Sequence, residues 1–164
     1  MLTPDNQPIR RSIRLKDFNY SSSGAYYVTI CAFDHQLVFG EVVDNGLVPT
    51  EWGKIAEAYW TKIRERWAPV ELDEYVLMPN HLHGVLIFPG GTNAPTSLGN
   101  IVNWYKSSVT KAVLRLEGGE EAKVWQRNYY EHIVRDENDL LRIQEYIAAN
   151  LYKWADDEYY PKER

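Results

Sequence analysis

Short segments in which apolar and β-branched residues alternate or cluster recur along the chain and predict β-strands. Asp44, Asn45 and Gly46 follow one of them and favour the positive φ angles of a tight hairpin turn into Leu47 and Val48. Pro79 and Asn80 interrupt another pair of apolar segments. The predicted strands are residues 25–33, 37–43, 70–78, 81–88 and 129–135.

Three longer segments carry apolar residues at helical spacing. Residues 51–67 form the first, with Thr50 as its N-cap and Pro69 beyond its end. Residues 98–116 form the second, capped at or near Ser97 and ended by glycine, and Asp136 caps a third over residues 137–150. Strands mixed with long helices in this order predict an α+β fold, in which helices cover an antiparallel sheet of about 4–5 strands.

The composition limits the kind of protein. A chain of 164 residues, 45% hydrophobic and 25% charged, is expected to form one soluble globular domain. Its apolar runs are far shorter than a membrane span, and its first residues have no apolar segment typical of a secretory signal, so we expect no membrane partner. The single cysteine, Cys31, excludes an intramolecular disulfide and fits a cytoplasmic location.

Charge is unevenly distributed around the net value of −5. Residues 1–16 hold four bases and one acid, whereas the chain from Asp136 onward holds 8 acids and 4 bases. We therefore expect a basic arm over residues 1–24, a globular domain over 25–155 and a loose acidic tail over 156–164. A basic arm on a near-neutral domain predicts local, salt-sensitive contact with phosphates. Its cationic residues are Arg10, Arg11, Arg14 and Lys16.

Two of the four histidines, His81 and His83, lie two residues apart in a predicted strand. Residues i and i+2 of a strand point to the same face, so the two imidazoles should project together into a cleft while Leu82 points the other way. Paired imidazoles on a rigid strand can bind one divalent metal ion, although a pair of structural histidines has the same pattern.

An ordered set of motifs resembles the HUH endonuclease superfamily, and within it the REP-associated single-tyrosine transposases. The similarity extends over residues 10–155 and places the histidine pair before a helix that carries a tyrosine. It implies a ferredoxin-like sheet, a divalent Mg²⁺ or Mn²⁺ ion, and cleavage of single-stranded or hairpin DNA by a monomer or homodimer. The motifs are residues 11–16, 24–31, 77–84, 98–102 with 105–107, 124–135 and 143–150.

In this family the nucleophilic tyrosine and an amide metal ligand lie one turn apart on the helix, positions that match Tyr146 and Asn150. Their i, i+4 spacing puts them on one helix face. The family usually continues from the asparagine into proline, whereas this chain has Leu151. Without that helix stop, the helix could run on towards Trp154 and alter the angle of Asn150.

Further polar residues are candidate DNA contacts, namely Lys106, Gln126, Arg127 and His132. For His132, a hydrogen-bonded structural role is the alternative. Two other functions remain open for the chain as a whole. One is a hydrolytic metalloenzyme that uses the same histidines without a covalent intermediate, and the other is a domesticated protein that binds hairpin DNA without cutting it.

Overall fold

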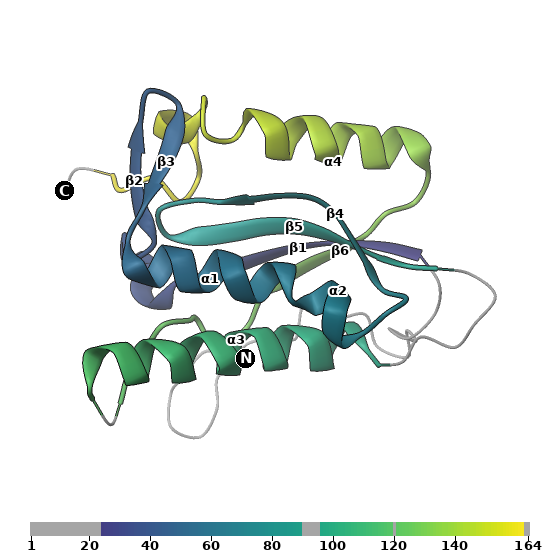
Figure 1. Ribbon diagram of the computed structural model, residues 1–164. Coiled ribbons are helices and arrows are strands. Elements are labelled where there is room, and N and C mark those ends of the chain that lie inside the picture. The colour runs from purple at the N-terminus through teal and green to yellow at the C-terminus, as the bar shows by residue number, and fades with distance from the viewer. Residues whose placement is uncertain (1–23, 90–95, 120, 163–164) are drawn as a thin grey trace, which may run out of the picture.

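The protein is an α+β domain, described here from a computed structural model that covers residues 24–89, 96–119 and 121–162. The predicted basic arm therefore lies outside the described residues. A four-stranded antiparallel sheet forms the centre, with strand order β4-β5-β1-β6 (Figure 1). Its strands are β1 (Gly24–Cys31), β4 (Glu71–Leu77), β5 (His81–Phe88) and β6 (Tyr130–Ile133). The remaining elements are β2 (Gly40–Val43), β3 (Gly46–Pro49), α1 (Glu51–Thr61), α2 (Ile63–Arg66), α3 (Leu98–Glu117), α4 (Glu137–Ala149) and the 3₁₀ turns Phe33–His35 and Trp154–Asp156.

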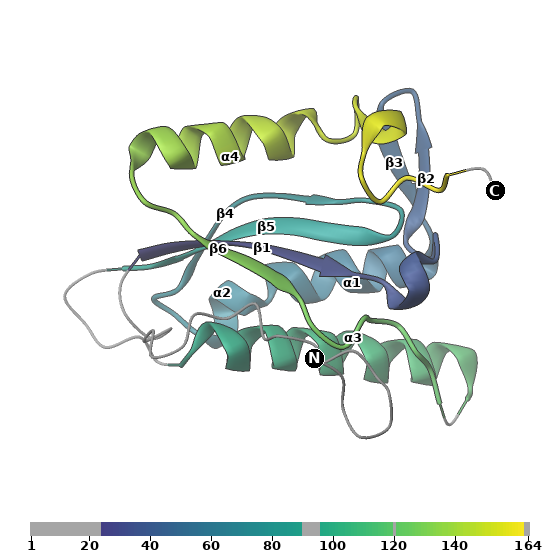
Figure 2. The ribbon, with the colours of Figure 1, turned by 180° about the vertical axis from the view of Figure 1, so that it is seen from behind.

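The order β1-α1-β4-β5-α3-β6 and the strand arrangement are those of a ferredoxin-like sheet. Helices α1 and α3 cover one face, and α4 covers the other (Figures 1 and 2). The predicted fold class is thus confirmed. None of the helices in the described residues has the length and hydrophobicity needed to cross a lipid bilayer.

Local signals in the sequence set most element boundaries. The side chains of Thr50, Ser97 and Asp136 each accept a hydrogen bond from the backbone N–H three residues later, so all three predicted N-caps are present. Asp44 and Asn45 have φ angles of 50° and 62°, the positive values expected for the β2–β3 turn.

Two predicted elements differ from the structure. The helix expected over 51–67 divides at Lys62 into α1 and the short α2, which turns so that Ile63 is buried. The strand expected from residue 37 begins only at Gly40 because the preceding backbone is bonded elsewhere: Phe39 N–H donates to Pro79, and Phe39 C=O accepts from Thr50. Strands β2 and β3 form a separate ribbon outside the main sheet.

The sheet divides the buried side chains into two sets. Val28, Ile30 and Leu82 belong to the large core under α1 and α3. Tyr27 and Val85 belong to a smaller cluster under α4, with Ile143 and Ile147 from that helix. The face that carries His81 and His83 is therefore the α4-covered side, which holds the smaller of the two clusters.

We expected the acidic tail to be loose, but its residues 156–159 lie against the domain. Residues 154–159 turn back beside the loop that joins β4 to β5, and the Asn80 side chain donates to the Tyr159 carbonyl at 2.8 Å. The ring of Tyr159 stacks on His35 at a centroid separation of 5.3 Å. Aromatic stacking and a buried amide hydrogen bond therefore hold this segment against the domain.

A substitution at Gly84 tests how closely β5, the strand that carries His81 and His83, packs on the core. A Cβ at this position would overlap the fully buried ring of Trp60. We expect Gly84→Ala to lower the free energy of unfolding by about 1–3 kcal/mol, measured by urea denaturation, since neither strand nor ring can move without cost. Gly119→Ala is the matched control, because its Cβ would meet no described atom closer than 3.9 Å. Equal stability of the two variants would contradict this packing.

Candidate active site

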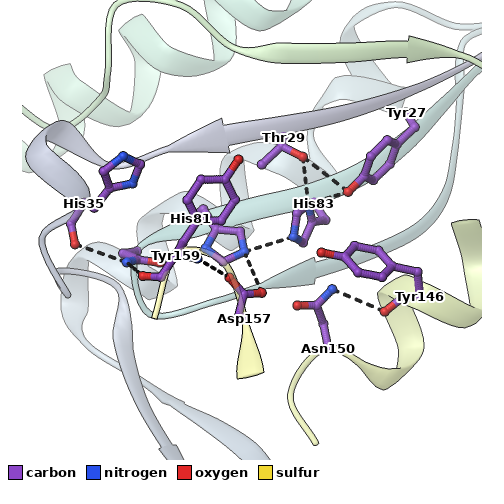
Figure 3. Close-up of polar contacts among 10 residues, drawn as sticks. Tyr27, Thr29, His35, His81, His83, Tyr146, Asn150, Asp157 and Tyr159 are labelled. Carbon is purple, nitrogen blue, oxygen red and sulfur yellow. Dashed lines mark hydrogen bonds and ion pairs between the residues drawn. The ribbon is translucent and has the colours of Figure 1, made fainter. Parts of the chain in front are cut away.

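The register between β1 and β5 defines the position of the histidine pair. Thr29 lies opposite His83, and Cys31 lies opposite His81. Leu82 points into the large core, so the expected alternation along the strand holds. Both imidazoles lie on the α4 side of the sheet, side by side (Figure 3).

Hydrogen bonds orient the two rings. Their Nε2 atoms are 2.9 Å apart, and His81 Nδ1 is 2.7 Å from the side-chain oxygen of Asn80. His83 Nδ1 lies 2.7 Å from the Tyr27 hydroxyl and 2.8 Å from the Thr29 hydroxyl. The two Nε2 atoms therefore converge on a common point, while the two Nδ1 atoms are held by neighbouring side chains.

Burial keeps both rings uncharged. It lowers the pKa of His81 to about 2, with a smaller effect from the adjacent His83, and lowers the pKa of His83 to about 3. A metal ion requires the neutral form of imidazole, and these two rings are neutral throughout the physiological range.

The tail contributes a carboxylate that the sequence does not predict. Asp157 Oδ2 lies 3.7 Å from His81 Nε2, and its side chain is 3% exposed. Burial raises the pKa of Asp157, against a hydrogen bond from the Tyr159 N–H. Ligand atoms of His81, His83 and Asp157 all lie within 4.8 Å of one another.

The sequence led us to expect that the histidines face an open cleft, but in the structure they do not. His81 is 0% and His83 1% exposed, because the tail lies over them, with the Tyr159 and His81 ring centroids 4.7 Å apart. The tail therefore closes the site.

Helix α4 places Tyr146 and Asn150 beside the histidine pair within the same chain. The ring of Tyr146 lies 5.3 Å from that of His83, and its hydroxyl points towards the pair (Figure 3). Tyr146 remains 47% exposed, whereas Asn150 is buried and donates to the Tyr146 carbonyl at 3.2 Å. The residues of the expected site therefore come together without exchange of a helix between subunits.

Leu151 does not extend the helix. Helix α4 ends at Ala149, with Asn150 as its C-cap, and the Lys153 N–H donates to the Ala149 and Asn150 carbonyls in the turn that follows. Asn150 still points from the helix towards the space in front of the histidines (Figure 3).

Two cavities flank Tyr146, and both are lined by Arg142 and Glu158 as well. Burial raises the pKa of the Tyr146 phenol; a hydrogen bond with Asn150 opposes this, and the charges of Asp157 and Glu158 add to it. In the closed site, the tail thus disfavours ionisation of the tyrosine.

A metal ion fits the chemistry of this donor set. Two ligands about 2.0–2.1 Å from one ion are about 3 Å apart when adjacent in its coordination sphere, which matches the Nε2 pair. A carboxylate and a side-chain amide, from Asp157 and Asn150, are available nearby as oxygen donors of the kind that Mg²⁺ and Mn²⁺ prefer.

Three of the predicted DNA contacts lie elsewhere, in a groove of about 710 Å³ between α3 and residues 122–127. Its described lining includes Lys106, Lys111, Lys123 and Arg127 and no aspartate or glutamate. Lys106 itself is partly engaged, because its Nζ donates to the carbonyls of Gln126 and Arg127, and burial lowers its pKa to about 8. It fastens the Gln126–Arg127 backbone to α3.

His132 has the structural environment considered as the alternative. Its Nε2 lies 2.8 Å from Asp139 Oδ2, and Asp139 also accepts from the Arg135 N–H and from Arg142. This network joins β6 to the first turn of α4. The hydrogen bonds from the Arg135 backbone and the His132 side chain hold the pKa of Asp139 below its ordinary value.

Several site residues were missed from the sequence. Tyr27 and Thr29 lie in a predicted strand, but only the β1–β5 register shows that they face His83. Asn80 was identified only as an interruption between strands. No periodicity connects the tail with residues some 75 positions earlier, so nothing in the sequence indicated Asp157.

Comparison with known proteins gives three findings. The family model described as IS200-like transposase matches residues 36–150. An uncharacterised protein of Haemophilus influenzae is 38% identical, covering 92% of this chain and 93% of that protein. A solved structure of a REP-associated tyrosine transposase bound to a REP hairpin superposes with a TM-score of 0.63 and 19% identity, covering 86% of this chain and 74% of the other. This last likeness shows a shared fold.

The contacts of Tyr146 lead to a prediction about its pKa. Replacing Asp157 and Glu158 by Asn and Gln should lower the phenol pKa, because both carboxylates now disfavour the phenolate. The measurement is a pH titration followed by NMR of ¹³Cζ-labelled tyrosine. Asp156→Asn is the control, since Asp156 is exposed and is not among the charges acting on Tyr146. An unchanged or higher pKa in the double variant would contradict this arrangement of the tail.

Proposed function

We propose that this chain cleaves and rejoins DNA strands, because the chain belongs to the IS200-like transposase family. The membership agrees with the resemblance that the motifs indicate. The observation that carries the proposal is the position of Tyr146, whose ring lies 5.3 Å from His83 on the face where His81 and His83 converge. A nucleophile and a metal-binding pair in one site are what covalent cleavage of a phosphodiester requires.

The residues that would hold a divalent Mg²⁺ or Mn²⁺ ion are His81 and His83 through Nε2, with Asn150 as the oxygen ligand expected from the helix. Asp157 is a second oxygen donor, 3.7 Å from His81 in the closed site. When bound, the ion supplies a positive charge that polarises the scissile phosphate and stabilises the charge developing on it.

The chemistry of the chain itself centres on Tyr146. Its Oη attacks phosphorus, the bond from phosphorus to the 3′ oxygen breaks, and the products are a 5′-phosphotyrosine and a free 3′-OH. The phenolic proton leaves, with the carboxylate of Glu158 as a nearby acceptor, and the departing 3′ oxygen gains a proton. A second attack by an incoming 3′-OH reverses these changes and frees Tyr146. No nucleotide cofactor is needed, because the adduct conserves the bond energy.

The proposed substrate is single-stranded DNA next to a hairpin. The solved relative of the same fold is bound to a REP hairpin. In this chain, the groove whose described lining has Lys106, Lys111, Lys123 and Arg127 and no acidic residue offers a surface for a phosphate backbone. The basic arm, with Arg10, Arg11, Arg14 and Lys16, is proposed to bind the foot of the same hairpin. Gln126 would add a neutral contact, and His132 acts through Asp139 on the position of α4.

Tyr146→Phe tests the nucleophile. This variant removes only the hydroxyl, so it should keep its fold and its DNA binding while losing both the nicked product and the covalent protein–DNA adduct. The assay is incubation with a single-stranded hairpin substrate and Mn²⁺, followed by denaturing electrophoresis. Tyr130→Phe and Tyr152→Phe are matched controls, exposed tyrosines that should retain full activity.

The same assay separates the alternative functions. Cleavage without an adduct in Tyr146→Phe would indicate a hydrolytic metalloenzyme that uses the histidines and water. A wild-type protein that binds the hairpin but neither cuts it nor forms an adduct, with Mn²⁺ present, would be a binding protein. An adduct that persists in Tyr146→Phe, mapped to another peptide, would assign a different tyrosine.

The groove is tested by its charge. Changing Lys111, Lys123 and Arg127 together to Gln should weaken hairpin binding. The negative slope of log K against log[salt] should become shallower by about 2–3, because about one counterion fewer is released for each lost phosphate contact. Fluorescence anisotropy at several salt concentrations measures this slope. A triple Lys54, Lys62 and Arg64 to Gln variant is the control, with the same loss of charge on α1, on α2 and at Lys62 between them. Equal slopes for both variants would exclude the groove as the hairpin site.

A further inference from the structure

Asn80 lies between the histidine pair and two other parts of the chain. It is fully buried in the turn between β4 and β5. Its side-chain oxygen lies 2.7 Å from His81 Nδ1, and its side-chain nitrogen donates to the His35 carbonyl at 3.1 Å and to the Tyr159 carbonyl at 2.8 Å. Every polar atom of the amide is engaged.

These contacts fix the orientation of the amide. The two carbonyls can only accept hydrogen bonds, so the group that faces them must be the NH₂ of Asn80. The oxygen of Asn80 must then face His81 Nδ1, and an oxygen acceptor requires a proton on that nitrogen. His81 therefore carries its hydrogen on Nδ1, and its Nε2 presents a lone pair.

The state of His81 determines that of His83. Two nitrogen atoms 2.9 Å apart share one hydrogen, and because His81 Nε2 is an acceptor, that hydrogen belongs to His83 Nε2. His83 Nδ1 is then bare and accepts from the Tyr27 hydroxyl at 2.7 Å. Thr29 can donate either to the same nitrogen or to the oxygen of Tyr27, 3.3 Å away.

We propose that Asn80 is a positioning residue that holds His81 permanently as the Nδ1–H tautomer, whereas His83 starts as the Nε2–H tautomer and must change to receive a metal ion. The role towards metal rests on the proposed function; the tautomers themselves do not. In the change, the His83 proton moves from Nε2 to Nδ1 with no net gain or loss. The hydroxyls of Tyr27 and Thr29 can rotate so that they accept a hydrogen bond from Nδ1–H. A carbonyl could also accept this hydrogen bond, but a group that only donates could not.

The same amide also joins the histidine pair to the tail and to the 3₁₀ turn Phe33–His35. Asn80→Asp separates the two roles. A carboxylate still accepts from His81 Nδ1, but its other oxygen faces the carbonyls of His35 and Tyr159 without a hydrogen to donate. Asn80→Ala removes both functions.

The first experiment reads the tautomers directly. Long-range ¹H–¹⁵N correlation of the uniformly ¹⁵N-labelled, metal-free wild-type protein should show His81 protonated on Nδ1 and His83 on Nε2. With Zn²⁺ as a diamagnetic probe, His81 should be unchanged and His83 should shift its proton to Nδ1. A metal-free spectrum with His81 protonated on Nε2 would overturn the proposal, as would one in which both rings share the Nδ1–H form.

The second experiment measures Mn²⁺ affinity by calorimetry. Asn80→Ala should bind Mn²⁺ about 10–100-fold more weakly than wild type, the usual loss when a residue that orients a ligand is removed, and Asn80→Asp should bind more tightly than Asn80→Ala. Asn103→Ala is the matched control, an exposed asparagine on α3 that should bind as wild type does. Equal affinity for wild type and Asn80→Ala would overturn the positioning role.

If the wild type does not bind Mn²⁺ at all, the metal site of the proposed function fails, while the wild-type spectrum still decides the tautomers. The same spectrum decides them if Asn80→Ala does not fold.

Discussion

The antiparallel pairing of β1 with β5 is the constraint on which the rest of the site depends. Its register sets Thr29 against His83 and Cys31 against His81, and it directs both imidazoles to the α4 face. A slip of one residue would turn the histidines into the large core and Leu82 out of it. The close approach of Trp60 at Gly84 adds a steric condition in the same strand. The pairing of the two strands is thus sufficient to place both histidines on this face, without their polar contacts.

Local sequence signals predicted much of this fold because they act over a few residues. The caps at Thr50, Ser97 and Asp136 and the turn at Asp44 each depend on one side chain and its nearest backbone, so they could be identified without knowledge of the fold. The division of the first helix at Lys62 and the late start of β2 depend on tertiary contacts instead. Strand alternation predicted that His81 and His83 would share a face. It could not predict what covers them, and for that reason the buried state of the pair and the position of Asp157 beside it were missed.

The electrostatic character of the two candidate surfaces differs sharply. The cavity next to Tyr146 and Asn150 is lined by four carboxylates, those of Glu145, Asp156, Asp157 and Glu158, against two cations, Arg142 and Lys153, whereas the described lining of the α3 groove has only cations among its charged residues. A polyanion is drawn to the second surface and repelled by the first. The net charge of −5 therefore does not reveal that the described lining of the α3 groove is cationic, while carboxylates outnumber cations in the cavity beside Tyr146.

The arrangement of helices α3 and α4 on opposite faces of the sheet has a consequence for the path of the DNA (Figure 1). The groove lies along α3 and Tyr146 lies on α4, so under the proposed function a nucleic acid that touches both must pass from one face of the sheet to the other. Double-stranded DNA has a persistence length of about 50 nm and cannot follow so tight a curve without a kink. Under the proposed function, the DNA between the stem and the scissile phosphate would therefore have to be unpaired, and long enough to pass from one face of the sheet to the other.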